Sequence, residues 1–201
     1  TALADYDQAI ALNSGVPLIH GERGDLLQAM GELVGAVSSY GTAIELKPDW
    51  AEAYTGRARA LLGIGDREAA LLDFEFCTKL KPQDAWVWNL RAVAEFSCGD
   101  DDAALRSSAE LVERLPGPQL WFGLKERALL VWRMGDAELA SELLEEAVGL
   151  APDDPNAASL LLHLGVVQLA AGALSDARAT LEDANERSAQ PFSIWVQLML
   201  W

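Results

Sequence analysis

The 201-residue sequence has few of the residues that build redox, metal or membrane sites. It contains two cysteines, Cys77 and Cys98, which lie 21 residues apart and match no metal, redox or disulfide framework. It has no run of about 18 apolar residues, so no segment is expected to span a bilayer. No signal peptide is visible either. We therefore expect a cytoplasmic protein, or a periplasmic or secreted one if a leader precedes Thr1.

Positive charge is also scarce. The chain has 15 lysines and arginines against 31 aspartates and glutamates, which gives a formal net charge of -16. Such a charge repels nucleic acids and anionic membrane surfaces, so neither is an expected partner, whereas protein partners stay open. The apolar fraction of 51% is enough for a packed core and excludes a disordered chain.

Catalytic motifs are missing as well. The two histidines, His20 and His163, lie far apart and have no carboxylate or nucleophile at motif spacing. We interpret His20 as a packing residue, whereas His163 lies on the fifth predicted first helix, at a position that can face the groove. The sequence has no metal-binding cluster, no phosphate-binding glycine loop and no G-x-S-x-G motif. We therefore expect a protein that is not an enzyme and has no metal and no cofactor.

The chain does contain a repeat. Six alanines recur every 34 to 37 residues, at Ala2, Ala36, Ala70, Ala104, Ala140 and Ala177. A glycine precedes each of the last five by five residues, at Gly31, Gly65, Gly99, Gly135 and Gly172. A proline follows four of them by twelve residues, at Pro48, Pro82, Pro116 and Pro152. A period of this length indicates a stack of small structural units, each unable to bury its apolar face alone.

Each unit is predicted to contain two helices, and residues 51–84 show the pattern most clearly. Apolar residues recur there at helical spacing in two segments: Tyr54, Ala58, Leu61 and Leu62, then Ala70, Phe74, Cys77 and Leu80. Gly65 can adopt the positive φ that ends a helix, and Asp66 can cap the next helix. Pro82 then closes the second helix. The predicted unit is a helix, a tight turn, a second helix and a proline loop.

Small residues at fixed positions predict where the helices cross. They lie midway along the five first helices, at Gly24, Ala58, Ala92, Ala128 and Gly165. Bulky residues are expected to fill the space beside the crossings: Tyr6, Tyr40, Phe74, Leu144 and Leu181. Cys77 stands where other copies have alanine and is interpreted as a small buried residue.

These residues resemble the tetratricopeptide repeat, whose pattern is a mid-helix Gly or Ala, a turn glycine, a second-helix Ala, an aromatic, another Ala and a closing Pro. The third copy departs from it, with Ser108 and Leu111 at the aromatic and small positions. The resemblance implies an all-α, right-handed α-solenoid of stacked helix-turn-helix repeats, one array over 1–201. Its predicted full repeats are 17–48, 51–82, 85–116, 119–152 and 155–189.

Both ends of the sequence lie within a unit. Residues 1–13 match a second helix and are interpreted as a half repeat, and residues 191–201 as a terminal or capping helix. The latter segment is apolar nearly all round, whereas natural arrays end in polar capping units. We therefore expect a fragment of a longer chain, or an end that docks onto something else, with self-association through 191–201 as one option.

The resemblance also implies a binding surface, because first helices in this family line a concave groove that binds peptides or helices. The amino-terminal positions of this groove are polar and acidic, and the later ones are aromatic and apolar. The predicted partner-binding residues are Arg59, Trp86, Asn89, Val93, Phe96, Phe122, Lys125, Leu129, Trp132, Arg133, Leu162 and Val166. Aromatic anchors would take the apolar face of a partner helix or peptide, and the basic residues would take its acidic groups.

Two interpretations of function follow, because a third, an independent hydrolase or transferase, has no supporting motif. The leading one is a non-catalytic scaffold that binds a protein or peptide partner in its groove. The alternative is a regulatory or substrate-docking domain of a larger enzyme or sensor whose catalytic part lies outside this chain. The aromatics could instead pack against neighbouring helices or against a continuation of the chain. A clamp for acidic chaperone tails is not expected, because Gly21, Asp25, Glu52 and Gly56 occupy its groove sites.

Overall fold

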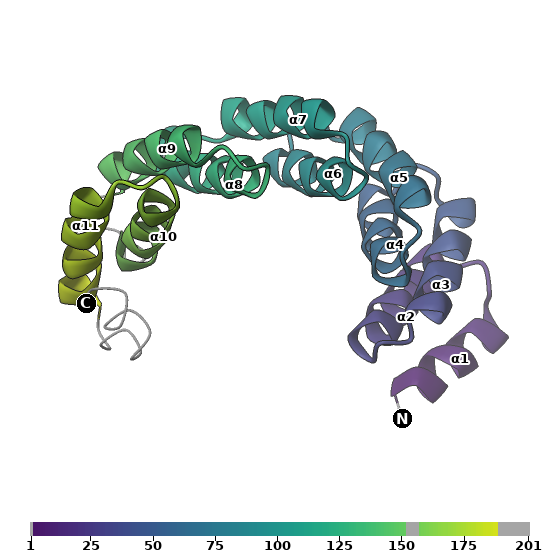
Figure 1. Ribbon diagram of the computed structural model, residues 1–201. Helices are drawn as coiled ribbons and strands as arrows, with labels where there is room; N and C mark the ends of the chain where they lie inside the picture. The colour runs from purple at the N-terminus through teal and green to yellow at the C-terminus, as the bar shows by residue number, and fades with distance from the viewer. Residues whose placement is uncertain (1, 152–156, 189–201) are drawn as a thin grey trace. The chain divides into compact units, whose positions relative to one another are not determined.

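The computed structural model describes residues 2–151 and 157–188. Eleven α-helices and one short 3-10 helix make up this part of the chain, which contains no β-strand (Figure 1). The helices are α1 (Ala2–Leu12), α2 (Pro17–Ala29), α3 (Leu33–Leu46), α4 (Ala51–Ile64), α5 (Arg67–Leu80), α6 (Ala85–Ser97), α7 (Asp101–Arg114), η1 (Gly117–Gln119), α8 (Leu120–Arg133), α9 (Ala137–Leu150), α10 (Ala157–Ala170) and α11 (Leu174–Arg187). The predicted all-α class is confirmed. Pro152 and the predicted terminal helix 191–201, with its self-association, lie outside the described residues.

The helices follow one another as the repeat predicts, a first helix, a glycine turn and a second helix. Contacts divide the chain into two compact units, residues 1–107 and 108–201. In the first unit α2 packs against α3, and α4 packs against α5. In the second, α8 packs against α9 and α10 against α11. The single array over 1–201 stays a prediction.

The turn between paired helices is set by glycine, and the α4–α5 turn shows how. Gly65 has φ of 89°, a left-handed conformation that strains any residue with a side chain. This conformation lets the Asp66 N–H donate to the Leu61 carbonyl at 2.9 Å, which ends α4. All five predicted turn glycines have positive φ: Gly31, Gly65, Gly99, Gly135 and Gly172.

Aspartates begin three of the second helices. The carboxylates of Asp66, Asp100 and Asp136 each accept a hydrogen bond from the backbone N–H three residues later, at 3.2, 2.9 and 3.0 Å. These bonds satisfy N–H groups that have no partner within the helix. The predicted capping role of the residue after the turn glycine is confirmed in these three copies.

Small residues allow the helices to approach closely. The second-helix alanines Ala36, Ala70, Ala104, Ala140 and Ala177 are fully buried. In the first unit, a Cβ built on Gly24 would lie 2.8 Å from the Tyr40 ring. In the second, a Cβ on Gly165 would lie 2.6 Å from Leu181 Cγ. The small residue and its bulky neighbour therefore fit together as predicted, since a methyl group already overfills the space.

Each unit has its own apolar core. In the first, Ile44, Tyr54, Cys77 and Val87 gather from α3, α4, α5 and α6. In the second, a cluster from α8, α9 and α10 contains Leu124, Ala147 and Leu160. Burial of Cys77 confirms its predicted structural role. None of the described helices combines the length and the apolar character needed to cross a membrane.

Candidate functional site

The two histidines and the buried cysteine have contacts within the chain. His20 Nε2 donates to the Ser14 carbonyl at 2.9 Å, and His163 Nδ1 donates to the Ser159 carbonyl at 2.6 Å. Burial raises the pKa of the Cys77 thiol, which disfavours the reactive thiolate. Across residues 2–151 and 157–188, no three His, Cys, Asp or Glu side chains gather as a metal site would require. The surface of the first unit is more informative.

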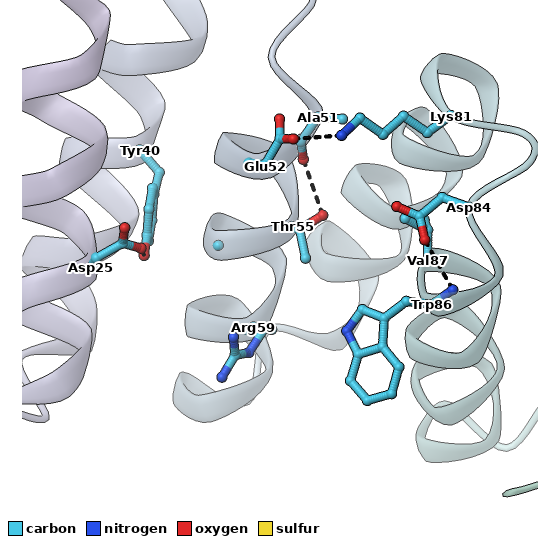
Figure 2. A pocket seen from close by; sticks show the side chains of 11 residues that line it. Asp25, Tyr40, Ala51, Glu52, Thr55, Arg59, Lys81, Asp84, Trp86 and Val87 are labelled. Atoms are coloured by element: carbon cyan, nitrogen blue, oxygen red, sulfur yellow. Dashed lines mark hydrogen bonds and ion pairs between the residues drawn. The ribbon is translucent and has the colours of Figure 1, made fainter. Parts of the chain in front are cut away.

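A hollow of about 210 Å³ lies in the first unit among α2, α4 and α6 (Figure 2). The first helices supply most of its walls, and Tyr40 reaches it from α3. The lining residues are Asp25, Tyr40, Ala51, Glu52, Thr55, Gly56, Arg59, Lys81, Asp84, Trp86 and Val87. The hollow therefore brings together two predicted partner-binding residues, Arg59 and Trp86, that are 27 positions apart in the sequence.

An ion pair occupies one end of the hollow. Lys81 Nζ donates to Glu52 Oε1 at 2.5 Å, and both side chains are largely exposed. This hydrogen bond lowers the pKa of Glu52 and raises the pKa of Lys81. The neighbouring Thr55 hydroxyl donates to the Ala51 carbonyl at 3.0 Å within α4. At this end the Lys81 ammonium and the Thr55 hydroxyl already have acceptors within the chain.

Arg59 and Trp86 lie toward the other end, on facing helices (Figure 2). Trp86 lies in the first turn of α6, where its backbone N–H donates to Asp84 Oδ1 at 3.0 Å. Trp86 is 53% exposed. Arg59 is also exposed and, among the described residues, has no hydrogen bond or ion pair. A large apolar surface thus stands near a guanidinium group with unused donors.

Tyr40 and Asp25 close the remaining side. The Tyr40 hydroxyl donates to Asp25 Oδ1 at 2.5 Å and approaches Gln28 Oε1 at 3.1 Å. Burial raises the pKa of Tyr40 well above its ordinary value, and the hydrogen bond to Asp25 acts in the same direction. A smaller hollow of about 60 Å³ adjoins this one and shares Asp25, Tyr40 and Glu52 with it; Glu22 and Trp50 also line it.

The other predicted residues of the first unit follow Trp86 along α6. Val93 is exposed and Phe96 is half-buried. Asn89 is 7% exposed, so it offers little surface to a partner. Of the predicted set, Arg59 and Trp86 are therefore the two that line the hollow.

The remaining predicted residues lie in the second unit. On α8, Lys125 pairs with Glu126 at 2.9 Å, and its Nζ lies 5.0 Å from the centroid of the Phe122 ring. Lys125 is therefore already engaged by its own helix. Arg133 is exposed, whereas the other members are half-buried: Phe122, Leu129, Trp132, Leu162 and Val166.

Sequence reasoning missed several residues that line the hollow. Lys81 and Asp84 belong to the loop between α5 and α6, which the repeat pattern treats as a connection. Tyr40 was expected only as a packing residue, yet its hydroxyl edge reaches the surface of the hollow. The loop charges on either side of Pro82 were the available signal for Lys81 and Asp84.

Two sequence models of the tetratricopeptide repeat match the chain, one over residues 55–117 and the other over 131–199. Together they cover more than half of it. The chain belongs to the tetratricopeptide repeat family. No curated protein sequence matches it significantly.

Several solved structures share the fold. BtubC from P. vanneervenii has a TM-score of 0.72 at 19% identity, covering 92% of this chain and 86% of its own. PilF from Pseudomonas aeruginosa has a TM-score of 0.70 at 16% identity, covering 91% and 80%. YrrB, a TPR protein with an unusual peptide-binding site, has a TM-score of 0.65 at 18% identity, covering 96% and 95%. These likenesses show an all-α solenoid fold, and the family assignment indicates a protein-interaction scaffold in general terms.

Proposed function

We propose that this tetratricopeptide chain is a non-catalytic scaffold that binds a partner helix or extended peptide on the surface formed by its first helices. The observation that carries the proposal is the hollow of the first unit, where Trp86 is 53% exposed beside the unpaired Arg59. Exposed tryptophan and arginine side chains in a concave site are the residue types that contribute most to protein recognition.

The roles of the two residues differ. Trp86 offers a flat apolar surface that a partner's aliphatic or aromatic side chain can cover. Arg59 offers several N–H donors that a partner's carbonyl or carboxylate oxygens can accept. In the second unit Trp132 and Arg133 supply the same pair of residue types on α8. The fold likeness to YrrB, which has a peptide-binding site, is consistent with this use of the fold.

The test uses peptides selected by phage display on the 201-residue chain and then labelled with fluorescein. Trp86→Ala should weaken their binding at least tenfold, because truncating a central aromatic commonly costs about 2 kcal/mol. Trp132→Ala tests the second unit in the same way. Fluorescence anisotropy measures affinity, and circular dichroism checks that helicity is retained.

Phe76→Ala is the matched control. Phe76 is an aromatic residue on the second helix α5, is 46% exposed and does not line the hollow. Its truncation should leave peptide affinity within about twofold of the original. If Trp86→Ala and Phe76→Ala have equal effects, or if the Trp86 variant loses its helical signal, Trp86 is not a docking residue.

A further inference from the structure

We propose that the hollow of the first unit selects a basic peptide, taking a lysine or arginine side chain beside Asp25 and Glu52 and an apolar side chain against Trp86. This inference rests on the proposed docking function and specifies the chemistry of the partner. It reverses part of the expectation from sequence, in which the basic groove residues were to take acidic groups of the partner.

The carboxylates at the hollow retain acceptor capacity. Asp25 accepts from Tyr40 through Oδ1, and Glu52 accepts from Lys81 through Oε1. A carboxylate has about four acceptor positions on its two oxygens. The bond that Asp25 accepts, and the bonds that Glu52 accepts from Lys81 and from a backbone N–H, therefore leave acceptor positions open on each residue. Asp25 and Glu52 line both the larger and the smaller hollow, so both carboxylates border the space that a cation would enter.

The smaller hollow suits a cationic head group. Its volume is about 60 Å³, and it is lined by Glu22 as well as by Asp25 and Glu52. This volume exceeds the roughly 30 Å³ that one water molecule takes in the liquid, so a group the size of an ammonium head has room there. Gly21 lies on the same wall and leaves room for the Trp50 ring, which packs where a Cβ would stand.

The apolar side of the hollow adds a second requirement for the peptide besides positive charge. Trp86 and Val87 of α6 face the hollow beside Ala51 of α4. A segment that carries both a basic and an apolar side chain on one face would place its charge at Asp25 and Glu52 and its apolar side chain on Trp86. The indole face also attracts cations, so an arginine of the partner is favoured there too.

The cations of the hollow do not oppose a basic partner strongly. Lys81 and Glu52 offset each other's charge as a pair. The remaining charges that line the two hollows are Asp25, Asp84 and Glu22 against Arg59, so negative charge stays in excess. Arg59 can donate to a peptide backbone carbonyl, which any partner sequence supplies. The chain as a whole carries -16, so long-range attraction favours a basic segment over an acidic one at low salt.

The experiment compares the charge preference of selected peptides with the effect of single carboxylate replacements. Display-selected peptides are synthesised with a fluorescein label, together with versions in which lysine and arginine become glutamine. Their affinities are measured by anisotropy for the original chain, Glu52→Gln and Asp25→Asn. Glu75→Gln is the matched control, because Glu75 is also exposed and paired with a lysine, Lys79 at 2.8 Å, but belongs to α5 outside the hollow.

We expect the selected peptides to carry both a basic residue and an aliphatic or aromatic one. Glu52→Gln and Asp25→Asn should each weaken binding by roughly tenfold, the usual scale for a charged hydrogen bond. Glu75→Gln should change affinity less than twofold, and added salt should weaken binding. The glutamine-substituted peptides should lose affinity for the original chain and become insensitive to Glu52→Gln.

Two outcomes overturn the inference while leaving the docking function in place. Peptides that depend on Trp86 but are acidic or uncharged would show that the hollow does not select basic groups. Equal losses for Glu52→Gln and Glu75→Gln would show that the net charge acts rather than the hollow. If instead no selected peptide depends on Trp86, the proposed docking function itself fails.

Discussion

Tyr40 is the residue at which α2, α3 and α4 meet. It extends from α3 and is 2% exposed. Its ring lies between Gly24 of α2 and Gly56 of α4, and a Cβ on Gly56 would be 2.5 Å from Tyr40 Cζ. The hydroxyl is fixed by Asp25 and Gln28, so the ring has no freedom to move aside. The side of the hollow near Asp25 therefore depends on a glycine at position 56.

We predict that Gly56→Ala destabilises the first unit. Overpacking of a fixed core ring costs about 1–3 kcal/mol, which exceeds the gain of about 1 kcal/mol in helix propensity. Gly63→Ala in the same helix is the control, since its Cβ would meet only the flexible end of Leu33 at 2.6 Å. Urea unfolding should show lower stability for Gly56→Ala and unchanged or higher stability for Gly63→Ala. Equal stabilities would contradict the packing described for Tyr40.

The raised pKa of Tyr40 predicts its behaviour in alkali. Burial keeps the phenol neutral in the folded chain, whereas an unfolded tyrosine ionises near its ordinary pKa of about 10. This contribution to stability is therefore complete below pH 10 and is lost as the pH rises above it. Of the three tyrosines, one should ionise only as the helical signal disappears. Absorbance at 295 nm measures this ionisation step, and Tyr40→Phe should remove it. Ionisation of all three tyrosines before unfolding would contradict the raised pKa of Tyr40.

At the scale of the helices, each glycine turn is followed by a position that begins the second helix. Asp66 and Asp136 cap α5 and α9 with their carboxylates. Ala173 occupies the same position before α11 with φ of -81° and ψ of 67°, close to the -82° and 75° of Asp66, but offers no side-chain acceptor. The backbone there is thus already suited to a cap that the sequence does not supply.

We predict opposite effects from exchanging these residues. Asp136→Ala should destabilise the second unit by about 1 kcal/mol, because the Leu139 N–H loses its acceptor. Ala173→Asp should stabilise α11 by up to about 1 kcal/mol, because a carboxylate there can accept from the free N–H groups of its first turn. Thermal unfolding followed by circular dichroism measures both. A loss of stability in Ala173→Asp would show that the two turns are not equivalent.

The same elements show what the sequence could predict. The turn glycines, the aspartate caps and the buried alanines depend on local backbone geometry, which a 34- to 37-residue repeat makes visible. The surface was less predictable, because it depends on the conformations and partners that long side chains adopt in the folded chain. Asn89 is buried rather than exposed, and Lys125 forms an ion pair with Glu126. Lys81 and Asp84 reach the hollow from a loop that the repeat pattern does not describe.

At the scale of the molecule, the central claim is that a tetratricopeptide chain with a net charge of -16 docks its partner on the first-helix surface. In the first unit this surface contains a hollow with an exposed tryptophan, an unpaired arginine and carboxylates that keep open acceptors. The second helix α5 also has exposed apolar side chains, Leu72 and Phe76. Exposure alone therefore does not identify the docking face. A map of the residues that a bound peptide contacts distinguishes the first-helix surface from the second-helix surface.

The most direct test is the change in backbone amide NMR shifts when a display-selected peptide is added to the ¹⁵N-labelled chain. In the first unit, we expect the largest changes at Glu52, Thr55, Arg59 and Trp86, with little change at Leu72 and Phe76 on α5. Changes centred on α5, with the residues of the hollow unaffected, would contradict the account.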